Sequence, residues 1–294
     1  MASGFIYYKL RRMKSYNNFD LWGCNTMKLH CIAENVFFPE TQEELIDLVK
    51  HLKDSEKPFL LLGSGSNIIL PPKLNKTVIS LTKVSSEMIF FEECVNVDCG
   101  VKIQKLIRES QKRGLGGIEY LYSVPCSIGG SILMNAGRGA EYCKSIGNNV
   151  LEVTALNIKS GKIVRLKNEQ CLFNYRESIF QSGDYVILSV IMHLDKMPQE
   201  VIETNIKERL KISYEKLDSS RPSCGSVFVY CSGRIMKFLK GLRIGGAAYS
   251  KKTTNWISNI NNAKYWQILA LIFIAIFIHK VTFQPYRLEV EIWK

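Results

Sequence analysis

The clearest helical pattern lies between Thr41 and Lys53, where apolar side chains recur three and four positions apart. Thr41 precedes this run, and Glu44 comes three residues after Thr41. This is the spacing of a capping box, so a helix is expected to begin at Thr41. The same periodicity predicts helices over residues 103–114, 201–217 and 235–239, and an apolar helix from Ala263 onward.

Strands are predicted where short apolar runs end at turn residues. The turn Ser160-Gly161 separates two such runs and predicts a hairpin. The full set of predicted strands covers residues 59–62, 68–70, 150–158, 162–166, 185–194, 226–230 and 288–293. This mixture of helices and strands indicates the α+β class.

Met197-Pro198 marks the predicted domain boundary, because it follows the last strong strand and a polar, charge-rich helix begins after it. We therefore expect one domain over residues 25–196 and a smaller one over residues 197–294. Residues 1–24 include a basic stretch without the apolar core of a signal peptide, so we expect a disordered or loosely attached leader.

One stretch raises the question of a membrane span. Residues 268–278 are eleven uninterrupted apolar residues, closed by His279 and Lys280. Crossing a bilayer takes about 20 apolar residues, so the pattern favours a buried helix and no stable membrane span.

The chain carries 39 basic and 27 acidic residues, a net charge of +12 over 294 residues. A positive surface attracts phosphates, nucleotides or anionic membranes, although a lysine-rich genome would give the same excess. The nine cysteines form no Cys-x-x-Cys pair, so neither a zinc site nor a disulfide framework is indicated, and no metal is expected. We interpret the cysteines as reduced thiols of a cytoplasmic protein.

Two glycine-rich segments are candidates for binding a phosphate-bearing ligand. In Gly63-Ser64-Gly65-Ser66-Asn67, between two predicted strands, backbone N–H groups and side-chain donors could cradle a pyrophosphate. The segment matches neither a dinucleotide-binding fingerprint nor a P-loop, and a plain glycine-rich turn would explain it as well. The segment from Pro125 to Gly137 opens a helix with small residues, which suits either phosphate binding or close helix packing.

Four more segments bring polar groups together, over residues 175–180, 222–228, 241–247 and 289–291. Arg176 has the planar fork that a carboxylate substrate needs. Ser226 follows a glycine turn, but the segment is not the Gly-x-Ser-x-Gly motif of a hydrolase. Glu289 and Glu291 alternate on the last predicted strand and would share one face. Taken singly, each segment is also explained as a turn or a solvated edge.

Taken together and in order, these motifs resemble the MurB family, the UDP-N-acetylenolpyruvoylglucosamine reductases of peptidoglycan synthesis. The resemblance runs from about residue 25 to 292. It rests on Asn25-Thr26-Met27, Gly63 to Asn67, Pro125 to Gly137, Tyr175-Arg176-x-Ser178-x-Phe180, Gly225-Ser226-Val227-Phe228 and Arg243-Ile244-Gly245-Gly246-Ala247. No long insertion separates the C-terminal motifs, a layout similar to the shorter, type II branch of the family.

The resemblance implies a PCMH-type FAD-binding fold of two subdomains over residues 25–196 and a smaller α+β substrate-binding domain over residues 197–294. It implies FAD as cofactor, NADPH as reductant and a UDP-sugar as substrate, in the cytoplasm, with no nucleic-acid partner and a monomer favoured. The cofactor-binding residues it implies are Gly63, Ser64, Gly65, Ser66, Asn67, Pro125, Ser127, Gly129, Gly130, Asn135, Gly137, Arg243, Gly245 and Gly246.

The implied reaction reduces an enolpyruvyl ether, which needs a hydride at one carbon and a proton at its neighbour. No side chain supplies a hydride, so a flavin must. By the resemblance, Arg176 and Glu289 act on the charge that builds on the substrate carboxylate, and Ser226 donates the proton. Glu291 falls where the family usually has a basic residue.

Several features depart from the family pattern. Cys126 stands where the family usually has glycine, Val229 where it has lysine or arginine and Thr253 at a position that is often histidine; the run 268–278 is unusually apolar. Two alternatives therefore stay open. One is a flavin-binding homologue with lost or weak turnover, and the other is a basic protein that binds membranes or nucleic acids.

Overall fold

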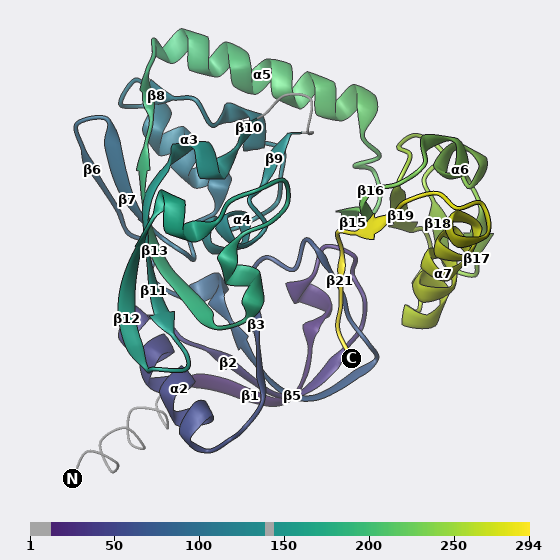
Figure 1. Ribbon diagram of the computed structural model, residues 1–294, viewed down its shortest axis with the longest axis horizontal. Helices are drawn as coiled ribbons and strands as arrows, with labels where there is room; N and C mark the ends of the chain where they lie inside the picture. The colour runs from purple at the N-terminus through teal and green to yellow at the C-terminus, as the bar shows by residue number, and fades with distance from the viewer. Residues whose placement is uncertain (1–12, 139–143) are drawn as a thin grey trace. The chain divides into compact units, whose positions relative to one another are not determined.

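The computed structural model describes residues 13–138 and 144–294 (Figure 1). The chain divides into two compact units, each assembled from separate stretches of sequence. The first takes the residues up to Tyr16, 35–64 and 76–210, and the second takes 17–34, 65–75 and 211–294. These units are not continuous in sequence, so the ranges 25–196 and 197–294 stay a prediction about functional domains.

A five-stranded antiparallel sheet forms the centre of the first unit. Its hairpin around Ser160-Gly161 is the predicted one, with Asn157 paired to Lys162. Side chains from the sheet belong to one continuous hydrophobic core, to which Val190 and Met192 contribute with no exposed surface. The strand order is β12 (Lys162–Lys167), β11 (Val150–Asn157), β13 (Tyr185–His193), β7 (Cys94–Asp98) and β6 (Met88–Phe91).

A second sheet has the order β1 (Lys14–Asp20), β2 (Ile32–Phe38), β5 (Lys73–Ser80) and β3 (Phe59–Leu62). Strands β3 and β5 run parallel, with Phe59 opposite Thr77. Residues 14–24, counted in the predicted leader, therefore form β1 and the 3-10 turn Leu21–Cys24, and the expectation of a loose leader is wrong there. Residues 1–12 of that prediction lie outside the described chain.

Helix α2 (Gln42–Asp54) confirms the prediction made from the Thr41 cap. The Thr41 hydroxyl accepts a hydrogen bond from Glu44 N at 3.1 Å, while the Glu44 carboxylate accepts one from Glu40 N at 2.7 Å. Other helices and strand pairs of the first part of the chain are α3 (Ile103–Gln111), α4 (Ile128–Leu133), α5 (Gln199–Lys216), the pair β8 (Leu115–Gly116) and β14 (Asp195–Lys196), and the pair β9 (Gly137–Arg138) and β10 (Lys144–Ser145).

The C-terminal part of the second unit packs two helices with a small sheet. Tyr249 and Phe228 are its largest fully buried side chains, and the Tyr249 hydroxyl donates to Leu271 O at 3.1 Å. Helix α7 (Tyr265–Val281) packs on α6 (Gly233–Phe238) and on two strands of the sheet. The sheet has the order β15 (Ser223–Ser226), β19 (Trp256–Asn259), β18 (Ala247–Tyr249) and β17 (Arg243–Ile244).

Two predicted strands are interrupted in the structure. The run 226–230 divides at Val227, because β15 pairs with β19 whereas β16 (Phe228–Tyr230) pairs with β20 (Arg287–Leu288). The run 288–293 likewise divides at residues 289–290, after which β21 (Glu291–Ile292) pairs in parallel with β4 (Ile68–Ile69). The single-strand argument that Glu289 and Glu291 share a face was therefore wrong.

Helix α7 confirms the predicted apolar helix but not its full burial. Five of its residues are buried, whereas Phe273 is 67% and Phe277 is 54% exposed. Within the described ranges, no helix is both long and apolar enough to cross a membrane. The eight cysteines in those ranges are free thiols; Cys143 lies outside them.

Candidate active site

The first glycine-rich segment connects β3 to β4 and passes from the first unit into the second after Ser64. Gly65 has φ of +61°, and a Cβ atom there would lie 2.2 Å from Cys24 O. Thr26 N also donates to Gly65 O at 3.0 Å. Only glycine fits this close approach of two backbones, which fixes the course of the segment through Ser66 to Asn67.

The second glycine-rich segment meets the first within the first unit. Ser127 caps α4 by accepting a hydrogen bond from Gly130 N at 3.3 Å, and a Cβ atom at Gly63 would lie 3.2 Å from the same hydroxyl. Gly129 lets α4 approach Cys99 closely, since its N–H donates to Cys99 O at 2.9 Å. Pro125 precedes the cap by two residues. The sequence thus predicted separately two segments that the fold brings together.

Side-chain hydrogen bonds join the end of this segment to the arginine motif. Asn135 donates to Asn174 O at 2.8 Å, and Arg176 donates to Gly137 O at 3.0 Å. Ser178 donates to Leu133 O at 2.7 Å. Arg176 has φ of +57° and its guanidinium carbon lies 5.7 Å from the ring centre of Tyr175. The arginine is therefore held in place on both sides.

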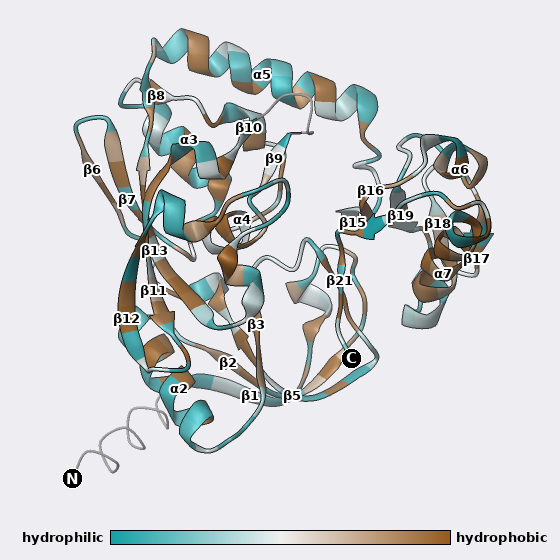
Figure 2. Cartoon of the chain, in the orientation of Figure 1, coloured by the Kyte–Doolittle hydropathy of each residue, from teal (hydrophilic) through white to brown (hydrophobic). Residues whose placement is uncertain are grey.

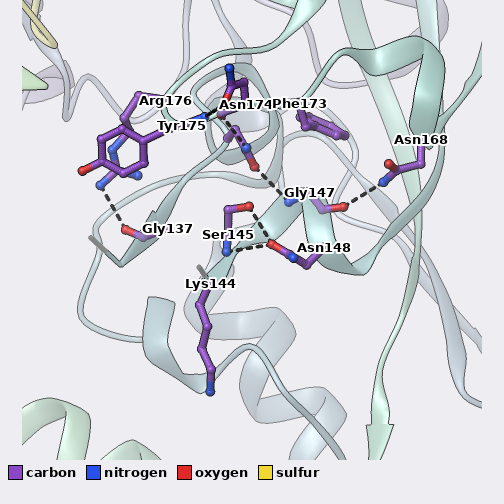
Figure 3. Close-up of a pocket in the computed structure, with 11 residues that line it drawn as sticks. Gly137, Lys144, Ser145, Gly147, Asn148, Asn168, Phe173, Asn174, Tyr175 and Arg176 are labelled. Carbon is purple, nitrogen blue, oxygen red and sulfur yellow. Dashed lines mark hydrogen bonds between the residues drawn. The ribbon is translucent and has the colours of Figure 1, made fainter. Parts of the chain in front are cut away.

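These residues line a pocket of about 380 Å³ (Figure 3). Arg176 brings positive charge to it, and the other polar groups are mostly side-chain amides, whereas the Lys144 side chain extends away from the other lining side chains (Figure 3). A lining with one guanidinium group and several neutral donors suits a carboxylate or phosphate group. The lining residues are Asn135, Gly137, Lys144, Ser145, Gly147, Asn148, Asn168, Phe173, Asn174, Tyr175 and Arg176.

In the second unit, backbone hydrogen bonds bring three predicted motifs side by side. Glu289 N donates to Val227 O at 2.9 Å, directly after Ser226. The Asn67 amide donates to Glu289 O at 2.9 Å, and Asn67 O accepts from Glu291 N at 2.9 Å. Ser226 and Glu289 therefore lie on neighbouring stretches of backbone. Arg176 belongs to the other unit, where its surroundings are those described above.

Two positioning residues were missed as site residues by the sequence analysis. The Thr26 hydroxyl donates to Ser223 O at 2.7 Å, which ties the start of the unit to β15. Asn255, in a left-handed conformation, accepts from Phe228 N at 3.0 Å and donates to Phe228 O at 2.8 Å. Thr26 lay within the segment that carried the family resemblance. The contact itself could not be read from the local sequence, because Phe228 lies 27 residues from Asn255.

The polar groups around Arg243 form hydrogen bonds mainly within their own segment and with helix α7. Arg243 Nε donates to Gly245 O at 2.7 Å, and Gly246 N donates to the Gln267 amide oxygen at 3.0 Å. A Cβ atom at Gly245 would lie 2.1 Å from Gln267 Nε2. Close packing with α7 therefore explains these glycines, and their place in cofactor binding stays a prediction.

The departures from the family pattern are accommodated within each unit. Burial raises the pKa of the Cys126 thiol to about 11, and its sulfur lies 2.9 Å from the Ser131 hydroxyl. Thr253 accepts a hydrogen bond from Asp218 N at 2.8 Å and donates to Lys216 O at 3.0 Å, which anchors the end of α5. Val229 is half-buried in β16.

The first unit offers a cradle that fits a flavin nucleotide. Ser127 faces two glycine positions, Gly63 and Gly130, where side chains would fill the space beside its hydroxyl. The Tyr120 and Ser123 hydroxyls are buried and lack a hydrogen-bond partner within the described ranges. Such groups need an acceptor or donor to offset their desolvation. The same ranges contain no cluster of His, Cys, Asp or Glu that could hold a metal ion.

Comparison with known proteins agrees with this geometry. Residues 33–167 match the family described as FAD binding domain. A UDP-N-acetylenolpyruvoylglucosamine reductase of Thermotoga maritima is 30% identical over 94% of this chain and 98% of its own length. The corresponding protein of Thermotoga petrophila is 32% identical over 80% of this chain and 84% of its own.

The structural comparison extends to the whole fold. The crystal structure of UDP-N-acetylenolpyruvylglucosamine reductase (MurB) from Thermus caldophilus superposes with a TM-score of 0.77 at 26% identity, over 96% of this chain and 99% of that one. This match and the FAD binding domain confirm the α+β class and the PCMH-type fold expected from the motifs. The chain belongs to the MurB family, the UDP-N-acetylenolpyruvoylglucosamine reductases.

Proposed function

We propose that this chain is an FAD-dependent, NADPH-driven reductase that converts UDP-N-acetylglucosamine enolpyruvate to UDP-N-acetylmuramate in peptidoglycan precursor synthesis. The observation that carries the proposal is the relative named for this reduction, which matches 94% of the chain at 30% identity. The shared fold adds support but would not by itself establish the chemistry.

Bound FAD, once reduced by NADPH, would supply the hydride that the enolpyruvyl carbon requires. The chain contributes the site: Gly63, Ser127 and Gly130 form the cradle described above, and Asn135 holds the neighbouring loop. The other residues assigned to FAD by the family motifs are Ser64, Gly65, Ser66, Asn67, Pro125, Gly129, Gly137, Arg243, Gly245 and Gly246. The glycines keep side chains out of the space that a nucleotide needs.

Arg176 and Glu289 are assigned to the substrate carboxylate. Hydride addition at the terminal carbon moves negative charge onto that carboxylate as an enediolate. Arg176 is already fixed by Gly137 and Tyr175, so little reorganisation is needed when the charge develops. A carboxyl group can stabilise an anion by donating a hydrogen bond, and this is the role assigned to Glu289.

Ser226 is assigned as the proton donor to the neighbouring carbon. A hydroxyl suits this role because the enediolate is a strong base and the proton crosses only a hydrogen-bond distance. The Glu289–Val227 backbone bond keeps the serine and glutamate segments in register within one unit.

We also propose that the enzyme works in the cytoplasm, as a monomer, without a nucleic-acid partner. The free thiols of the described cysteines support a reducing compartment. The positive net charge suits a substrate and a reductant that both carry phosphate groups.

Visible spectra of the purified protein test the proposal. Under anaerobic conditions, the flavin bands should bleach on addition of NADPH and return only when UDP-N-acetylglucosamine enolpyruvate is added. A flavin that is reduced but never reoxidised by the sugar would indicate a homologue without turnover. A protein that binds no flavin would overturn the proposal.

A further inference from the structure

Helix α7 has two apolar faces. Its buried face packs on α6, β17 and β18, and comprises Ile268, Leu271, Ile272, Ala275 and His279. On the opposite face, Trp266, Phe273, Phe277 and Val281 fall within an arc of about 80° at the helical repeat. A helix at the surface of a soluble domain normally has polar residues on that outer face. We name these four residues the outer stripe.

The outer stripe is large and well exposed. Trp266 is 61%, Phe273 is 67% and Phe277 is 54% exposed, and the two phenylalanine rings stack with centroids 6.4 Å apart. Phe283, two residues after the helix, is 93% exposed, and Phe238 of the adjoining α6 is 80% exposed. The helix is apolar over nearly its whole length (Figure 2). Exposed aromatic groups on this scale mark an interaction surface.

The sequence around the outer stripe has an extreme charge. From residue 219 to 288, between Asp218 and Glu289, there are ten lysines and arginines and no aspartate or glutamate. Lys264 caps α7 and Lys280 lies in its last turn, while Arg234 and Lys237 are exposed on α6. The chain that forms and flanks α7 and α6, from residue 219 to 288, therefore carries only positive side-chain charges.

We propose that α7 lies on the surface of an anionic lipid bilayer, with the outer stripe in the headgroup and acyl boundary and the surrounding lysines and arginines against anionic headgroups. Tryptophan and phenylalanine on one side with basic residues beside them are the composition of helices that bind in this plane. The helix spans about 25 Å along its axis, which suits lying on a bilayer, and it is too short to cross one.

The charge also decides between this occupant and a second copy of the chain. A symmetric dimer through α7 would bring two surfaces of the same sign together, since neither copy has an acidic residue between 219 and 288 to pair with. An anionic bilayer attracts this surface instead, because each basic residue near the bilayer is drawn to the negative headgroups. Charge complementarity therefore favours the lipid surface.

Co-sedimentation of the full-length protein with vesicles tests the proposal. The protein should sediment with vesicles of phosphatidylglycerol and phosphatidylcholine in equal parts, should stay in solution with phosphatidylcholine alone, and should be released by salt. Brominated lipids should quench a tryptophan signal that is lost in Trp266→Phe, which would place the start of α7 at the bilayer.

Paired substitutions separate the two components of binding. The Phe273→Ser and Phe277→Ser double variant should lower the vesicle partition coefficient about tenfold or more, because it removes the two largest stacked groups. Its matched control, Ile89→Ser with Ile163→Ser, removes similarly exposed apolar side chains from the first unit and should change binding less than about twofold.

The charged component is tested in the same way. The double variant Arg234→Glu with Lys237→Glu should weaken binding to anionic vesicles about tenfold, whereas Lys162→Glu with Lys167→Glu in the first unit should not.

Several outcomes would overturn the proposal. These are absence of binding to any vesicle, equal binding to neutral and anionic vesicles, or equal losses in the control variants. Concentration-dependent self-association that disappears in the Phe273 and Phe277 variant would instead show that a second copy covers α7. Thermal melting of each variant confirms its fold, and the lipid and salt dependence of the unaltered protein stands whether or not a variant folds.

Discussion

Each of the two units holds its own predicted site residues, and the two do so by different means. In the first, side chains hold the arginine motif: Asn135, Arg176 and Ser178 each donate to a backbone oxygen. In the second, backbone pairing from Glu289 N to Val227 O joins the segments of Ser226 and Glu289, and the Asn67 and Asn255 amides hold the backbone beside them. A single substitution can therefore disturb the geometry of the first unit, whereas in the second it can remove a reacting group and leave the backbone in place.

The largest effect is expected from Ser226→Ala. This variant tests whether a substitution in the second unit removes a reacting group and leaves the backbone in place. Reduction of the enolpyruvyl sugar should fall on the order of 10³-fold, because the proposed proton donor is lost. Reduction of the flavin by NADPH should stay nearly unchanged, since that step needs no proton from Ser226. Anaerobic stopped-flow absorbance measures the two half-reactions separately.

Ser223→Ala, on the same strand, is the matched control. The backbone oxygen of Ser223 accepts the Thr26 hydrogen bond, so loss of its hydroxyl leaves that contact intact. Both half-reactions should keep their rates. Equal loss of both half-reactions in Ser226→Ala would remove the proton-donor assignment.

Gly65→Ala should destabilise the protein by about 3 kcal/mol and lower its flavin content, because it combines a left-handed backbone with a backbone clash at Cys24. Gly183→Ala is the control, since Gly183 has φ of +78° and no atom within 4 Å of its Cβ position. That variant should cost only about 1 kcal/mol, from the backbone conformation alone. Urea unfolding and the ratio of flavin to protein absorbance measure both effects; equal values for the two variants would show that the close approach to Cys24 contributes nothing.

Asn135→Ala should cost about 2 kcal/mol and raise the KM for the sugar more than it lowers kcat, because it leaves Asn174 O and Gly147 N unpaired beside Arg176. Asn148→Ala, in the same pocket, removes an exposed amide whose oxygen accepts hydrogen bonds from Ser145 N and Ser145 Oγ; it should cost about 1 kcal/mol and leave the KM unchanged. Urea unfolding and steady-state kinetics provide the measurements. If both variants had the same KM, side-chain control of the arginine motif would be disproved.

The sequence predicted those parts of the fold that local signals determine. The Thr41 cap predicted α2, and the turn Ser160-Gly161 predicted the hairpin between β11 and β12. The interruptions at Val227 and at residues 289–290 escaped prediction because distant partners cause them. Asn255 O accepts from Val227 N, and the Asn255 side-chain amide accepts from Phe228 N and donates to Phe228 O. Asn67 bonds on both sides of the second break.

The candidate site shows the same limit. Asn67 was assigned to cofactor binding from its segment, yet its amide donates to Glu289 O, 222 residues away. The position of α7 was clear from its apolar run, whereas the exposure of its outer face depends on which neighbours the fold supplies. Patterns in the sequence identify residues with the chemistry that a site needs. Only tertiary contacts decide which of these residues form hydrogen bonds with one another.

The smallest predicted effect concerns Asp218, beside the join of α5 and β15. The Ser250 hydroxyl donates to its carboxylate at 2.7 Å and is the main cause that lowers the pKa of Asp218 below its ordinary value of 3.8, with Ser220, Arg221 and Lys252 contributing less. Because the folded pKa is depressed, the carboxylate stabilises the fold above about pH 4, and this contribution is lost as the pH falls through the folded pKa. Asp218→Asn should therefore cost about 0.5 kcal/mol at neutral pH, after screening by solvent, and progressively less in acid. Urea unfolding of both proteins at neutral and acidic pH measures the difference in their free energies of unfolding. A difference that grew in acid would show that the charged Asp218 carboxylate does not stabilise the fold.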